Sequence, residues 1–81
     1  MSRPARVTVL TTRTCHLCEH ATAEVARIAG ELGVAWEARD ITDDRELMGE
    51  YAEQVPVILV DGRPQGHWRV DEAALRAALC R

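Results

Sequence analysis

The sequence predicts an α/β domain in which three helices cover a mixed four-stranded sheet, in the order β-α-β-α-β-β-α. Short apolar runs of strand length alternate with longer segments that carry apolar residues at helical spacing. The first β-α-β unit implies a parallel pair with a right-handed crossover, and the Asp61-Gly62 pair implies a later antiparallel hairpin. At 81 residues the chain has room for one hydrophobic core, so we expect a single domain over residues 1–81.

The first half of the chain supplies the β-α-β unit. Residues 6–11 predict a buried strand because they are rich in valine and leucine. A helical stripe follows, formed by Leu17, Ala21, Val25, Ile28 and Leu32. Gly33 then marks the end of this helix. Residues 34–39 alternate in the period of a strand, with Trp36 on the core side.

The second helix is predicted from its start signal. Residues 42–46 hold several N-cap candidates, among them Asp44, and Asp43 stands at capping-box spacing from Glu46. Leu47 and Tyr51 form an inward face after them. Pro56 ends this stretch, and the continuous apolar run 57–60 is suited to a central strand.

The chain then turns back and finishes in a helix. Asp61-Gly62 predicts a tight turn into a short strand over residues 63–65, which Pro64 assigns to the edge of the sheet. Asp71 is suited to cap the last helix. The inward face of that helix is predicted to hold Leu75, Ala78 and Leu79.

Composition and charge exclude several classes of function. The formal net charge of −3 gives no electrostatic reason to expect a nucleic acid or an anionic membrane as partner. All ten basic residues are arginine, so lysine chemistry is excluded. The segment Met1–Arg6 and the short apolar run after it do not predict a signal peptide, and no run is long enough to span a membrane. We therefore expect a cytoplasmic monomer.

The sequence Cys15-His16-Leu17-Cys18 lies between the first strand and the first helix. Two cysteines at this spacing lie one helical turn apart, and a helix N-terminus stabilises the thiolate of the first. The second is then close enough to attack a mixed disulfide formed at the first. The placement favours a redox pair; half of a metal site or two inert cysteines are the alternatives.

The chain resembles glutaredoxin-like proteins of the thioredoxin fold, both in this order of elements and in three motifs. The motifs are Thr14–Cys18, Val55-Pro56 and Asp61-Gly62. The resemblance covers roughly residues 6–80, allowing a boundary error of a few residues. It implies that Cys15 is the nucleophile and Cys18 the resolving cysteine. It also implies a cis proline at Pro56 that faces them, with Val55 pairing with a bound substrate chain, and a basic Arg13 that favours the Cys15 thiolate.

The resemblance further implies a small thiol–disulfide oxidoreductase that reduces protein disulfides or glutathione mixed disulfides without a bound cofactor. Glutaredoxins usually carry Pro-Tyr between the cysteines and a Gly-Gly pair after the fourth strand; this chain has His16-Leu17 and residues 65–68, Gln-Gly-His-Trp. Residues 68–71 instead resemble a stretch of redoxins that thioredoxin reductase recharges. The electron source is therefore either glutathione or thioredoxin reductase.

Three single residues keep two interpretations each. His16 either tunes the thiolate or is merely exposed; Trp68 either borders the active site or packs; Cys80 either forms intermolecular disulfides or has no role.

Two further functions are alternatives. One is a soft-metal carrier for copper or zinc, although such domains run β-α-β-β-α-β. The other is a binding module that uses the fold without turnover. No resident metal is expected under the leading hypothesis.

Overall fold

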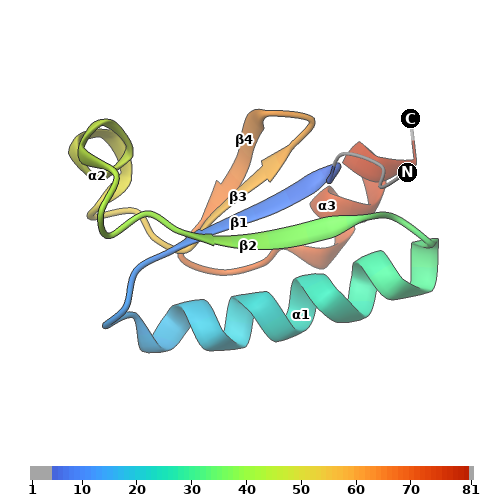
Figure 1. Cartoon of the computed structure of the whole chain (residues 1–81). Helices are drawn as coiled ribbons and strands as arrows, with labels where there is room; N and C mark the ends of the chain where they lie inside the picture. The colour runs from blue at the N-terminus through green and yellow to red at the C-terminus, as the bar shows by residue number, and fades with distance from the viewer. Residues whose placement is uncertain (1–4, 81) are drawn as a thin grey trace.

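The computed structural model describes residues 5–80 and confirms the predicted order of elements (Figure 1). The elements are β1 Val7–Thr11, α1 His16–Leu32, β2 Trp36–Asp40, α2 Arg45–Tyr51, β3 Val57–Val60, β4 Arg63–His67 and α3 Glu72–Leu79. Residues 1–4, which belong to the segment Met1–Arg6, and residue 81 lie outside the described part of the chain.

The four strands form one mixed sheet in the order β2-β1-β3-β4. β1 runs parallel to β2 and antiparallel to β3, and β3 pairs antiparallel with β4. Asp61 and Gly62 both have positive φ, 51° and 83°, which closes the predicted hairpin. β4 is an edge strand, as Pro64 indicates, but it extends beyond the predicted 63–65 because Gly66 and His67 also pair with β3.

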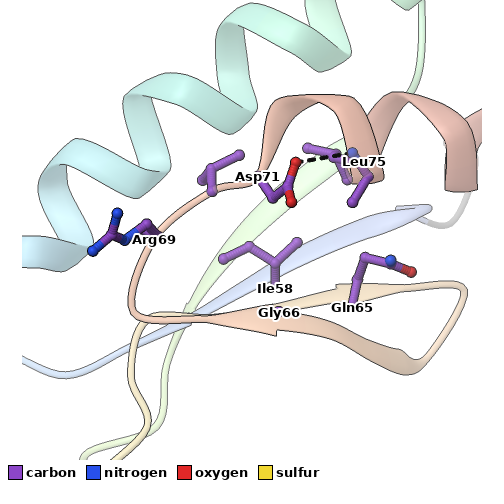
Figure 2. Close-up of a pocket in the computed structure, with 8 residues that line it drawn as sticks. Ile58, Gln65, Gly66, Arg69, Asp71 and Leu75 are labelled. Atoms are coloured by element: carbon purple, nitrogen blue, oxygen red, sulfur yellow. Dashed lines mark hydrogen bonds between the residues drawn. The ribbon is translucent and has the colours of Figure 1, made fainter.

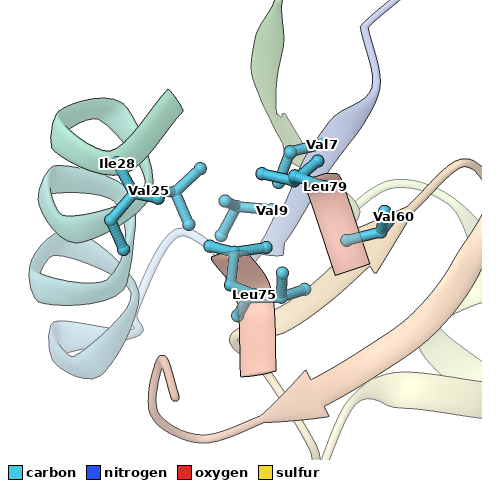
Figure 3. Packing of buried hydrophobic residues seen from close by; sticks show 8 residues of the cluster. Val7, Val9, Val25, Ile28, Val60, Leu75 and Leu79 are labelled. Atoms are coloured by element: carbon cyan, nitrogen blue, oxygen red, sulfur yellow. The ribbon is translucent and has the colours of Figure 1, made fainter. Parts of the chain in front are cut away.

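The core lies between the sheet and the pair α1 and α3. The inward side chains of β1 and β3 meet those of the two helices there, as Figure 3 shows. This cluster consists of Val7, Val9, Val25, Ile28, Ile58, Val60, Leu75 and Leu79. Trp36 is partly buried against it. On the other face, α2 packs over a smaller cluster of Leu10, Ile41 and Val57. The helices thus hold the ends of β1 and β3 from both faces.

Two local predictions are wrong. The buried stripe of α1 begins at Cys18, which is 3% exposed and faces the sheet, instead of at Leu17, which is 59% exposed. α2 is capped by Asp44, whose Oδ1 accepts a hydrogen bond from the N–H of Leu47 at 3.0 Å, instead of by Asp43. Asp43 instead accepts a hydrogen bond from the guanidinium of Arg13.

An ion-pair network joins α1 to α3 on the surface. Arg27 of α1 contacts Glu72 of α3 at 2.6 Å, and Arg76 of α3 contacts Glu31 of α1 at 2.7 Å. Arg76 also bonds Glu72 at 2.9 Å. Hydrogen bonds from Arg27 and then from Arg76 lower the pKa of Glu72, and the bond from Arg76 lowers the pKa of Glu31. Both carboxylates are therefore held in the charged form.

Replacing Leu75, which is 2% exposed, by alanine should lower the free energy of unfolding by about 2–5 kcal/mol, because it leaves a cavity between α3 and the sheet. The matched variant Leu17→Ala should change it by less than about 0.5 kcal/mol, since that side chain is exposed. Urea unfolding measures both. Equal losses would contradict the assignment of Leu75 to the core and Leu17 to the surface.

The charge network predicts a dependence of stability on pH. Because the folded-state pKa values of Glu31 and Glu72 are depressed, their stabilisation is present above the glutamate pKa of about 4.3 and is lost as the pH falls below it. Arg76→Gln should reduce stability at pH 7 and flatten this acid-side loss, measured by thermal unfolding across pH. The control Arg63→Gln removes an arginine that forms no ion pair within residues 5–80 and should leave the pH profile unchanged.

Candidate active site

Cys15 is the N-cap residue of α1 and sits in the loop that leaves β1. Its backbone is extended, with φ −93° and ψ 105°, and its N–H donates to the carbonyl of Thr12 at 3.2 Å. Its Sγ accepts a hydrogen bond from the N–H of Cys18 at 3.1 Å. A sulfur thus takes the place that a serine or aspartate oxygen takes in most caps. At this position it meets the positive end of the dipole of a 17-residue helix.

A disulfide joins Cys15 and Cys18, whose Cα atoms are 5.3 Å apart. Cys18 is only 3% exposed because it faces the sheet, while Cys15 is half-buried at the tip of the helix. Cys15 is therefore more accessible to solvent than Cys18, and a substrate disulfide reaches the Cys15 sulfur first. Cys80, at the end of α3, is a free and exposed cysteine.

The Val55–Pro56 peptide bond is cis, as the family resemblance implies. It directly precedes β3, and the antiparallel register pairs Leu10 of β1 with Val57 of β3. Since the cysteine loop follows β1, this register puts the cis bond and the cysteine loop at the same end of the sheet. Pro56 is buried, and Val55 is partly buried against the α2 cluster.

Arg13 is engaged with the loop that leads into α2. Its Nη2 contacts Asp43 at 2.6 Å, its Nε lies 3.9 Å from Asp40, and its backbone N–H donates to the hydroxyl of Thr42 at 3.1 Å. Hydrogen bonds from the Thr42 hydroxyl and N–H lower the pKa of Asp40, and the Arg13 charge adds to this effect. The positive charge of Arg13 thus faces two carboxylates. His16, the first residue of α1, is exposed.

Trp68 borders this end of the sheet without entering the core. It is 54% exposed and has the positive φ of 67°, which only glycine adopts easily. Its backbone N–H donates to the carbonyl of Pro56 at 2.8 Å, and its Nε1 donates to the carbonyl of Glu53 at 3.0 Å. Of the two sequence interpretations, the geometry favours the border position over packing. The left-handed backbone that places it gives no signal in a single sequence.

The sheet has hollows of different volume near its two edges, one beside β4 and α3 and the other between α1 and β2. On the side of β4 and α3, a cavity of about 20 Å³ lies among Gly66, Arg69 and Asp71 (Figure 2). The guanidinium of Arg69 points away from Ile58 and Leu75 in this view. On the side of β2, a groove of about 470 Å³ includes Cys15 and Cys18 in its lining. Arg69 belongs to the stretch 68–71 that the sequence analysis singles out, whereas the groove was missed because it depends on how distant segments pack.

Within residues 5–80, no group of three or more His, Cys, Asp or Glu side chains comes together to hold a metal ion. The last described element is the helix α3, whereas the copper-carrier order ends in a strand. Over the same residues, none of the helices combines the length and apolar character that crossing a membrane requires.

Comparison with known proteins places the chain among glutaredoxin-like sequences. Residues 6–80 match the profile of the Glutaredoxin-like domain family, DUF836. The uncharacterized protein Rv0508 of Mycobacterium tuberculosis is 36% identical over an alignment of 86 positions. The alignment covers 100% of this chain and 88% of the relative.

Solved structures share the fold. Protein Ne2328 from Nitrosomonas europaea superposes with a TM-score of 0.78 at 24% identity, covering 95% of this chain and 93% of that one. A wheat glutaredoxin superposes with a TM-score of 0.57 at 23% identity, covering 94% and 80%. The thioredoxin-like order and the mixed sheet predicted from the sequence are therefore confirmed.

The geometry of the two cysteines predicts unequal reactivity in the reduced protein. In a Cys80→Ser background at pH 7, iodoacetamide should modify Cys15 before Cys18, and Cys15 should react faster than free cysteine. The cap hydrogen bond favours the Cys15 thiolate, and burial protects Cys18. Peptide mapping by mass spectrometry at early times distinguishes the two sites. Equal labelling, or earlier labelling of Cys18, would contradict this assignment.

Proposed function

The chain belongs to the Glutaredoxin-like domain family, and on that premise we propose that it is a small thiol–disulfide oxidoreductase acting through Cys15 and Cys18. The observation that carries the proposal is the position of Cys15 at the N-cap of α1, where its sulfur accepts the N–H of Cys18. A cap residue of this kind is both accessible and electrostatically suited to be a thiolate. Cys18, one turn later, is buried. It is therefore suited to attack the mixed disulfide at Cys15, and not to form a mixed disulfide with the substrate itself.

The proposed reaction moves two electrons from the protein to the substrate. The Cys15 thiolate attacks one sulfur of a substrate disulfide, and the other sulfur leaves as a thiolate. Cys18 then loses its proton to solvent, and its thiolate attacks Cys15 Sγ in the mixed disulfide. The second substrate sulfur leaves, and the Cys15–Cys18 disulfide closes, which is the oxidised form described above. The substrate has gained two electrons and the protein has lost two.

Recharging is the same exchange in reverse. Two molecules of glutathione, or the dithiol of a thioredoxin reductase, reduce the Cys15–Cys18 disulfide again. No cofactor bound to this chain is needed for either route. The proposal places the protein in a reducing compartment such as the cytoplasm, as a monomer whose partners are disulfide-containing proteins and one of these two electron sources.

The neighbouring residues are proposed to position the substrate. Val55 and the cis Pro56 form the rim at the end of the sheet where the cysteine loop lies, so the Val55 backbone is suited to pair with a bound chain. His16 stands exposed beside Cys15 on the same turn. Arg13 is proposed to act mainly by holding the loop before Cys15, because its charge is engaged by Asp43.

Turnover tests the proposal directly. The pure protein should reduce bis(2-hydroxyethyl) disulfide with steady consumption of NADPH, recharged either by glutathione and glutathione reductase or by thioredoxin reductase. Cys15→Ser should fall to the uncatalysed rate, because the remaining thiols are the buried Cys18 and the distant Cys80, and neither is an accessible thiol at the helix N-cap. Cys18→Ser should accumulate a mixed disulfide on Cys15, visible by mass spectrometry.

Cys80→Ser is the matched control, since it removes a cysteine at the far end of α3 and should leave turnover unchanged. The absence of turnover with both electron sources, or turnover that survives Cys15→Ser, would refute the proposal.

A further inference from the structure

The groove on the β2 side of the disulfide has the size of a binding site. It holds about 470 Å³, within the range of about 300–1,000 Å³ that is usual for ligand sites. Its lining begins at Cys15 and Cys18 and continues along α1 to Ala26 and across to Ala38 of β2. Cys15 and Cys18 therefore lie at one end of a groove that extends along α1.

Small side chains keep the groove open. Ala23 and Ala26 face it from α1, and Ala38 faces it from β2. Ala23 and Ala38 are exposed and Ala26 is half-buried, so the floor is apolar and accessible. The alanine floor leaves room above it for the apolar side chains of an occupant.

The groove runs beside an open sheet edge. β2 is the outermost strand and, within residues 5–80, pairs only with β1 (Figure 1). Its other edge is therefore free to accept an extended chain by strand addition. A chain paired with β2 places every second side chain on the α1 face of the sheet, above the alanine floor. Backbone pairing and side-chain burial thus favour the same occupant.

The charges at the groove favour a cationic occupant. Arg13, which lines it, is already paired with Asp43 and lies near Asp40. Glu19 also lines it, is exposed, and forms no ion pair within the described residues. The free charge at the wall is therefore negative. Glutathione, whose two carboxylates outnumber its one ammonium group, is poorly matched to this negative charge, and a peptide with a net positive charge is well matched.

We propose that this groove receives an extended segment of a protein substrate that pairs with β2, places short apolar side chains on Ala23, Ala26 and Ala38, and carries a basic residue beside Glu19. The segment delivers the disulfide sulfur to Cys15 from the β2 side. This inference rests on the proposed function and names its substrate class: protein disulfides flanked by apolar and basic residues, held on the side of the helix away from the small cavity at Gly66.

The test compares two variants on two substrates. Ala23→Phe fills the groove, whereas Ala77→Phe adds the same ring at an exposed position of α3. The substrates are bis(2-hydroxyethyl) disulfide and a disulfide-linked dimer of a short peptide with valine and arginine beside its cysteine. Ala23→Phe should lower kcat/KM for the peptide by about tenfold more than for the small disulfide, because the ring blocks the longer substrate.

Ala77→Phe should leave both values unchanged, and far-ultraviolet circular dichroism confirms that each variant is folded. Equal effects on both substrates in Ala23→Phe would overturn the inference. Failure of the wild type to reduce even the small disulfide would instead overturn the proposed function, so the two failures are distinguishable.

A binding measurement on the wild type needs no turnover. Titration with the same peptide, its cysteine replaced by serine, should shift the NMR amide signals of β2 and of residues 19–26 of α1. A peptide with glutamate in place of the arginine should bind about threefold or more weakly, and Glu19→Gln should remove that preference. Shifts confined to Val55, Val57 and Gly66, or equal binding of the two peptides, would contradict the assignment.

Discussion

The hydrogen bond from the Cys18 N–H to Cys15 Sγ is the contact on which the site depends. It fixes a cysteine where helices normally take an oxygen cap, and it does so at the start of the longest helix described in the chain. The same geometry turns Cys18 toward the sheet, where it is buried. One cap therefore sets both the exposure of the first sulfur and the protection of the second.

The rest of the fold keeps that cap in place. α1 and α3 pack on one face of β1 and β3, and α2 packs on the other face. The loops at the shared end of these two strands are therefore attached to a well-packed sheet. Arg13 ties the cysteine loop to the entry of α2, and Trp68 ties the end of β4 to Pro56. Both contacts lie at the end of the sheet where the cysteine loop leaves β1.

Much of this arrangement is predictable from local sequence because the signals are local. Gly33 ends α1 with a φ of 67°, Asp71 caps α3 through the N–H of Ala74, and Asp61-Gly62 closes the hairpin, each through the conformation of one or two residues. The local predictions fail where a residue far away in the sequence determines the local structure. Asp43 and Asp44 are equivalent as caps in the sequence, and Arg13, thirty residues earlier, engages Asp43. The groove beside the disulfide, likewise, exists because α1 and β2 bring alanines together, which no local pattern reports.

Cys15 and Cys18 are proposed to form a reversible two-electron couple. The most direct test is equilibration of the protein with mixtures of oxidised and reduced glutathione, extended to mixtures of oxidised and reduced dithiothreitol for more negative potentials. Acid quenching and thiol alkylation follow, in a Cys80→Ser background. We expect one transition in which two thiols appear together, with the same midpoint whether it is approached from the oxidised or the reduced protein. A pair that stays reduced or stays oxidised throughout, or that modifies one thiol at a time, would contradict it.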